Sequence, residues 1–157
     1  PSRGLGFSAI MLSEAVEGVS LEDLVVEERL SNPPQDPIQI PGNATTKDAL
    51  GYLHINCGTC HNQSEDGLPQ YTMNLWIDID HATETDSNTW QTTVDVDTEV
   101  FKDQHILGRI VPGDPDSSAL YYRMSHRDDI AQMPPIATKA IDEEGRAIIA
   151  EWIESLQ

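Results

Sequence analysis

The chain has 157 residues, with 27 acidic and 9 basic side chains, and its formal net charge at pH 7 is -18. This length is typical of one domain, and so negative a charge excludes binding of nucleic acids or anionic membranes through a basic patch. The longest apolar run, residues 7–12, is far shorter than the ~20 residues that span a bilayer. The chain opens with Pro-Ser-Arg and shows no signal peptide, which predicts a mature form or a piece of a longer protein.

The first predicted helix lies in an N-terminal extension. The Ser-x-x-Asp spacing at residues 20–23 is that of a helix-start box and predicts a helix over residues 21–30. Four prolines within residues 32–42 exclude a helix there and favour an extended linker. We therefore expect residues 1–43 to be an extension and proline-rich linker that packs on the main domain, residues 44–157.

A second helix leads into the only two cysteines of the chain. The Thr-x-x-Asp spacing at residues 45–48 predicts a helix start, and the helix is expected to run into Asn56. Ala49, Leu53 and Cys57 recur every four residues. This period predicts one buried helix face that ends at the cysteines.

The next segment, residues 62–108, is predicted to be rich in loops, with one candidate strand near residues 73–79. Most of it is strongly acidic. A turn follows, with Asp114 as the candidate cap of a helix, Pro115 at its first position and Met124 near its end.

The last helix has the clearest pattern. Three consecutive acids, residues 142–144, place negative charge where the helix dipole favours it. Apolar residues then recur at the spacing of one buried stripe, namely Ile148, Ile149, Trp152, Ile153 and Leu156.

The run Cys-Gly-Thr-Cys-His at residues 57–61 carries the chemistry, because Cys-x-x-Cys-His is the attachment signature of c-type haem. Two thiols three positions apart on a helical turn can bond the two vinyl groups of one porphyrin. The adjacent imidazole of His61 then faces the iron. We expect one haem c, covalently attached through Cys57 and Cys60.

Three other uses of the cysteine pair agree less well with the sequence than haem attachment does. A thioredoxin-like redox pair would follow a strand, whereas a helix is predicted here. A structural zinc normally needs four ligands, and no further cysteine is present to complete a cysteine-rich site. A disulfide between Cys57 and Cys60 would close too small a loop to add much stability.

The sixth iron ligand is predicted to be Met133. Two prolines follow it, so its sulfur would be presented from a stiff, extended loop. Met124 is expected in the core, and Met11 and Met73 lie beside apolar neighbours. A histidine is the remaining alternative, although His54 lies on the helix before Cys57. The other three are expected to be solvated surface groups: His81, His105 and His126.

Four blocks of sequence together resemble a bacterial mono-haem cytochrome c domain of the class I type. They are YLHINCGTCH at residues 52–61, VPGDP at 111–115, MPP at 133–135 and IAEWI at 149–153. They occur in the order of that family, and the resemblance covers about residues 44–157.

The resemblance implies an all-α fold of several short helices around one haem. It implies thioether bonds at Cys57 and Cys60, His61 as the proximal ligand and Met133 as the distal one. In this family the first and last helices cross, through a small residue on the first, here Ala49, and an aromatic residue on the last, here Trp152. The implied function is one-electron transfer and not catalysis, since two strong axial ligands leave no open iron position.

The chain departs from the family in its N-terminal extension and in a long acidic insertion between His61 and Gly108. Arg109 and Arg123 are candidate partners of the haem propionates, with ordinary surface arginines as the equal alternative. Calcium binding by the acidic insertion stays open, although a solvated acidic face is favoured over an EF-hand.

The expected partner is a redox protein with a positively charged docking patch, or a fused redox or carbohydrate-active module. Similar domains belong to larger secreted bacterial proteins, so we expect a periplasmic or extracellular location. The rival hypothesis is a haem enzyme, such as a peroxidase, or a ligand sensor, with an open sixth position on the iron.

Overall fold

The computed structural model describes residues 7–13, 17–63, 72–136 and 138–156. Within these ranges every regular element is a helix and no β-strand forms, which confirms the all-α prediction. In chain order the elements are α1 (Ala9–Ser13), α2 (Leu21–Val26), α3 (Ala44–Asn56), the 3-10 helix η1 (Glu84–Asp86), α4 (Asn88–Thr93), α5 (Ala119–Met124) and α6 (Glu143–Ser155). None of the helices in these ranges has the length and apolarity to cross a membrane.

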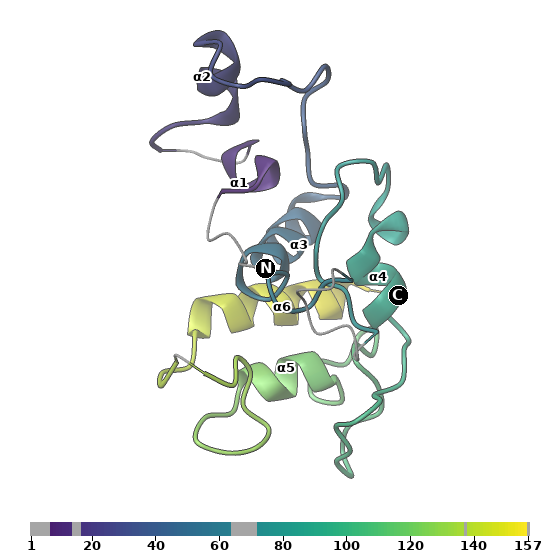
Figure 1. Ribbon diagram of the computed structural model, residues 1–157. Helices are drawn as coiled ribbons and strands as arrows, with labels where there is room; N and C mark the ends of the chain where they lie inside the picture. Colours follow the sequence, from purple (N-terminus) through teal and green to yellow (C-terminus); the bar gives the residue numbers. More distant parts are fainter. Residues whose placement is uncertain (1–6, 14–16, 64–71, 137, 157) are drawn as a thin grey trace.

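The centre of the molecule is the crossing of α3 and α6 (Figure 1). In the same view α5 lies below α6, α4 lies to the right of the crossing, and α1 and α2 lie above α3. The core side chains of the two crossing helices are fully buried: Ala49, Leu50, Leu53, Ile149, Trp152 and Ile153. Most of the apolar stripe predicted for the last helix therefore faces the core, as the 3.6-residue period requires.

A close contact at this crossing involves Gly145 of α6. A Cβ atom added to Gly145 would stand 2.3 Å from the ring of Tyr52, so the two helices approach closely only because position 145 has no side chain. The Tyr52 hydroxyl also donates a hydrogen bond to Asp142 at 2.9 Å, beside that glycine. Ala49, the small residue expected on α3, is fully buried as well.

The helix α3 begins slightly earlier than predicted. Its N-cap is Asn43, whose side chain accepts a hydrogen bond from the Thr46 N–H at 3.0 Å. Asparagine is among the best N-cap residues. Once it takes this position, Thr45 and Asp48 lie inside the helix, so the predicted start at Thr45 is wrong.

The helix α2 has the predicted capping box, with reciprocal hydrogen bonds between Ser20 and Asp23, but it ends at Val26 instead of residue 30. Glu28 adopts a left-handed conformation with φ of 54°. The Arg29 N–H then bonds the Leu24 carbonyl at 2.9 Å. This is a Schellman termination, here formed without glycine.

The helix α5 begins at Ala119 and not at Pro115, so the predicted start is also wrong. Asp114 instead caps a separate turn by accepting a hydrogen bond from the Ser117 N–H at 3.1 Å. The buried Ser118 hydroxyl donates to the Asp114 carbonyl at 2.8 Å. These bonds hold the turn apart from the helix, which nevertheless ends at Met124 as predicted.

The candidate strand at residues 73–79 is not a strand, because no neighbouring strand takes its hydrogen bonds. Its N–H groups bond elsewhere: Leu75 to the His61 carbonyl at 2.8 Å and Ile77 to His54 Nδ1 at 3.1 Å. Residues 73–79, called the extended wall below, therefore run in an extended conformation and are hydrogen-bonded to both the cysteine turn and α3.

The helix α4 was not predicted from the sequence. Its sequence has little apolar periodicity, and its buried face is made of Thr89 and Thr93. The Thr93 hydroxyl donates to the Thr89 carbonyl at 2.6 Å, which removes the cost of burying it. Ser87, which caps the helix, was the only local signal.

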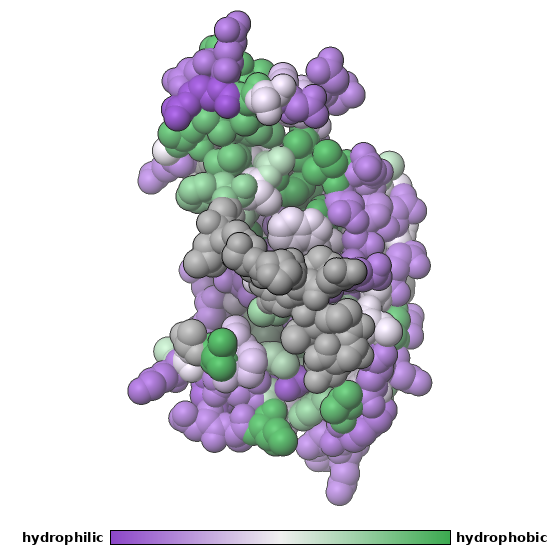
Figure 2. Space-filling view, viewed as in Figure 1, coloured by the Kyte–Doolittle hydropathy of each residue, from purple (hydrophilic) through white to green (hydrophobic). Residues whose placement is uncertain are grey.

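The N-terminal extension joins the main core at a few points. Ile10 of α1 and Ile40 of the proline-rich segment are both buried in the core cluster. Ser8 is within 2.9 Å of His54 Nε2, which is buried in α3. Figure 2 shows a hydrophobic patch between α1 and α2, with hydrophilic side chains at the outer end of α2.

Candidate functional site

Residues 57–61 form a tight helical turn directly after α3. The His61 N–H bonds the Cys57 carbonyl at 2.8 Å, and the Cys60 N–H bonds the same carbonyl at 3.0 Å. This main-chain pattern places the two cysteines and the histidine on one turn, which is the arrangement that the spacing predicted.

Gly58 allows this turn to sit against its neighbours. A Cβ atom at this position would lie 2.6 Å from the His54 carbonyl oxygen and 2.9 Å from the Leu75 carbonyl oxygen. Both are main-chain atoms, so a larger residue would force the turn away from α3 and the extended wall. The second residue of the Cys-x-x-Cys-His run therefore has a steric reason to be glycine.

The two thiols differ in exposure. Cys57 is half-buried and packs against the core cluster, whereas Cys60 is exposed, and neither forms a disulfide. Burial, with a smaller contribution from Cys60, raises the pKa of the Cys57 thiol to about 12. Cys57 is thus held as a neutral thiol, which disfavours a thiolate redox pair at neutral pH.

His61 and Met133 line one cavity of about 390 Å³, although they are far apart in the sequence. The cavity also takes residues from the segment 73–79, the segment 98–102, Arg109 and both ends of α5, and one more residue from the loop that carries Met133. Its lining is His61, Met73, Thr98, Glu99, Val100, Phe101, Lys102, Arg109, Ala119, Arg123, Ile130 and Met133. A volume of this size is typical of sites for small molecules and cofactors.

The His61 ring lacks the hydrogen bond that a buried imidazole usually makes. Its Nδ1 atom is buried and has no hydrogen-bond partner among the residues that the structure describes. Burial, and then the cations Arg123 and Arg109, lower the pKa of His61 below its ordinary value of 6.5. The neutral imidazole, which is the form that binds metals, is therefore favoured.

Two methionines line this cavity and not one. Met133 lies in the loop between α5 and α6, and its N–H bonds the Arg123 carbonyl at 3.0 Å. Met73 lines the same cavity from the extended wall and is half-buried. Met124 is buried in the core, as predicted. The sequence alone provided no signal that would bring Met73 to the site.

Arg109 and Arg123 both line the cavity, and neither is an ordinary surface arginine. Arg109 is only 6% exposed; it donates to the Thr92 carbonyl at 2.7 Å and forms an ion pair with Glu99 at 3.2 Å. Arg123 lies over the Phe101 ring, 5.0 Å from its centroid, and donates through Nε to the Ala131 carbonyl at 3.0 Å. Two guanidinium groups thus face a largely apolar cavity.

The other four histidines do not line this cavity. His54 is buried, with Nδ1 accepting from Ile77 and Nε2 beside Ser8, so both ring nitrogens have partners. His126 is half-buried and stacks on Tyr122 with ring centroids 3.9 Å apart, and His81 is also half-buried. Only His105 is exposed, so the prediction of three solvated histidines is wrong for the other two.

A second cavity, of about 350 Å³, lies beside the cysteine turn and holds none of the predicted ligands. It is polar and is lined by Asn62, Gln63, Asn74, Trp76, Asp78 and Asn88. Asn88 connects two of these residues: it donates to the Asp78 carboxylate at 2.7 Å and to the Trp76 carbonyl at 3.2 Å. In the described ranges no group of three or more histidine, cysteine or acidic residues is placed to hold a metal ion.

A comparison with protein families matches residues 78–136 to the family described as Planctomycete cytochrome C. The matched region includes Met133, Arg109 and Arg123 and stops short of the cysteine turn. The matched region also includes residues 78–105. These residues were expected to be part of an insertion, but they are themselves similar to a cytochrome family. No curated protein and no solved structure gives a significant match to this chain.

The matched region contributes much of the lining of the cavity that contains His61 and Met133. The match spans well under half of the chain. It supports a cytochrome c-like domain in this protein and, at that coarse level, electron transfer by a haem group.

Proposed function

We propose that this domain carries single electrons on one haem c, tethered by Cys57 and Cys60, with His61 and Met133 as the axial ligands. One observation supports this most strongly. The imidazole that follows the cysteine pair and the predicted distal methionine line a single cavity, although nothing in the local sequence relates them.

The residues of the cavity fit such a group. The buried Nδ1 of His61 has no partner in the described part of the chain, as expected for a ring whose surroundings are completed by a ligand. Apolar side chains such as Met73, Phe101 and Ala119 suit the porphyrin plane. Arg109 and Arg123 offer donors for its propionates, although Arg109 would then share its charge with Glu99.

When bound, the haem supplies an iron that alternates between the ferrous and ferric states. The chain supplies the rest: the cysteine turn presents His61, the loop after α5 presents Met133, and apolar side chains form much of the cavity lining. A thioether ligand raises the reduction potential.

The direct test is the covalent mass and ferric spectrum of protein matured in an oxidising bacterial periplasm. We expect the mass of the polypeptide plus one haem, unchanged by acid-acetone extraction, because thioether bonds survive that treatment. We also expect the weak red charge-transfer band that reports sulfur on ferric iron. Haem that extracts freely would contradict the attachment, and a high-spin spectrum would favour the rival, an enzyme or sensor with an open position.

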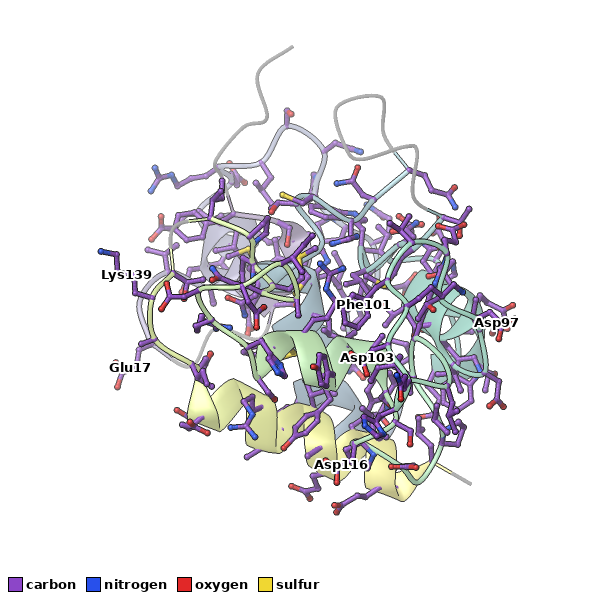
Figure 3. All side chains as sticks on the ribbon, turned by 90° about the horizontal axis from the view of Figure 1, so that it is seen from below. Glu17, Asp97, Phe101, Asp103, Asp116 and Lys139 are labelled. Carbon is purple, nitrogen blue, oxygen red and sulfur yellow. The ribbon has the colours of Figure 1, made fainter. Side chains whose placement is uncertain are left out.

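The proposed partner is a redox protein with a positive docking patch, either free or as a module fused to this domain in a periplasmic or extracellular protein. In support, the segment that lines the cavity at residues 98–102 belongs to a loop with four exposed acids: Asp95, Asp97, Glu99 and Asp103. In Figure 3, Phe101 and Asp103 lie near the middle of the view and Asp97 lies at its edge. The negative charge of the chain is thus carried close to the cavity.

Stopped-flow oxidation by a cationic and an anionic small complex of matched driving force tests this charge steering. We expect the cationic complex to react ~10-fold faster or more at low ionic strength. The advantage should fade between about 0.01 M and 0.1 M salt, as the screening length falls from about 30 Å to about 10 Å. Equal rates at low salt would contradict charge-steered docking and leave solubility as the role of the acidic surface.

A further inference from the structure

The loop that carries Met133 is held by one side chain that the function has not yet used. Three N–H groups of the Arg127 guanidinium serve four main-chain carbonyls, so at least one of the hydrogen bonds from Nη1 is shared between two acceptors. The contacts are Nη1 to Met124 at 2.9 Å, Nη1 to His126 at 2.6 Å, Nη1 to Met133 at 3.3 Å and Nε to Ala140 at 3.0 Å. No carboxylate of the described residues forms an ion pair with it.

These four carbonyls lie at the start, the middle and the end of the connection between α5 and α6. Met124 closes α5, Met133 is the predicted ligand, and Ala140 precedes the cap of α6. One side chain therefore ties both ends of the loop to the residue in its middle. Figure 1 shows this connection as a wide loop beside α5 and α6.

Apolar packing does little to fix the loop. Ala131 is buried, but Pro134, Pro135 and Ile136 are exposed, and Ile130 is 95% exposed. Hydrogen bonds must therefore supply most of its order. Gln132 adds a second brace: it accepts from the Asp128 N–H at 2.8 Å and donates to the Pro134 carbonyl at 2.9 Å.

We propose that Arg127 is a positioning residue for Met133: by binding the Met133 carbonyl and both ends of the loop, it holds the methionine sulfur at the cavity. This inference rests on the proposed function, because it assigns the support of the distal ligand in that site. Arginine suits the task because its rigid, planar group presents several donors at once, whereas lysine offers a single ammonium point on a flexible stem.

The test compares the haem-loaded protein with Arg127→Gln and Arg127→Lys, and with Arg146→Gln as a matched control. Arg146 of α6 is also half-buried, and it donates to the Tyr121 hydroxyl of α5 at 2.8 Å and to the Glu143 carboxylate at 2.6 Å. Among the described residues, neither of these partners belongs to the Met133 loop. Two readouts are measured: the red charge-transfer band of the ferric protein, and the affinity for added imidazole, which competes with the methionine.

We expect Arg127→Gln to weaken the red band and to bind imidazole at least about tenfold more tightly, because several hydrogen bonds that hold the competing ligand are lost. Arg127→Lys should restore part of the difference. Arg146→Gln should leave both readouts unchanged even where it lowers the melting temperature, since general destabilisation does not select the methionine loop.

Unchanged imidazole affinity and an intact red band in Arg127→Gln would overturn the inference while leaving the proposed function standing. Equal changes in Arg127→Gln and Arg146→Gln would also overturn it, because the effect would then be one of overall stability. Absence of the red band from the unsubstituted protein would instead refute the methionine ligation on which the inference rests.

Discussion

Met133→His is expected to keep a six-coordinate haem and to lower its reduction potential by roughly 100 mV or more, within the ~0.8 V range over which axial ligands act. Thioether sulfur favours ferrous iron, whereas a second imidazole stabilises ferric iron. The red charge-transfer band should vanish with the sulfur. Potentiometric titration and the ferric spectrum measure both effects.

Met73→Leu is the control that the structure makes necessary. Met73 lines the same cavity, so it is the competing source of sulfur, whereas Met124 is buried in the core. Leucine preserves most of the apolar volume, so Met73→Leu and Met124→Leu should retain the red band and shift the potential little. Loss of the band in Met73→Leu, with its retention in Met133→His, would identify Met73 as the ligand.

Gly145→Ala is expected to lower the free energy of unfolding by about 2 kcal/mol, which is typical of adding a methyl group to a closely packed contact. The new Cβ would stand 2.3 Å from the Tyr52 ring, which is also tied to Asp142 by its hydroxyl. The intrinsic helix preference of alanine over glycine, up to about 1 kcal/mol, acts in the opposite direction. Denaturant unfolding of the haem-loaded protein measures the net effect.

A double-mutant cycle isolates the steric origin of this effect. In a Tyr52→Ala background the added methyl group has no ring to meet, so Gly145→Ala should there be neutral or stabilising. The same loss of stability in both backgrounds would show that the Tyr52 contact does not limit the crossing of α3 and α6.

Local sequence patterns predicted those parts of the molecule whose causes are local. The capping box at Ser20 formed as expected, because a cap needs only a side chain and an N–H three residues away, and the predicted acids stand at the start of α6. The buried stripe of α6 followed from the helical period. Patterns failed where another nearby group competed, as Asn43 did at the start of α3 and Ser118 before α5.

In the candidate site, too, local features could be predicted from the sequence and long-range features could not. The turn from Cys57 to His61 is local, so its residues and spacing sufficed to predict a haem c attachment. The two prolines after Met133 predict it as a ligand, but the presence of Met73 in the same cavity could not be inferred, because residues 73 and 133 are 60 positions apart and line one cavity only in the folded chain.

By itself, then, the sequence determined the helical fold class, the placement of two cysteines and a histidine on one turn, and the negative charge, because each depends on residue type and on spacings of a few residues. Tertiary structure alone decided which methionines reach the cavity, that Arg109 is buried beside Glu99, and that Gly145 packs against the Tyr52 ring. It also brought Arg127 to the Met133 loop. These features depend on contacts between segments distant in the chain, whose geometry exists only once the core has packed.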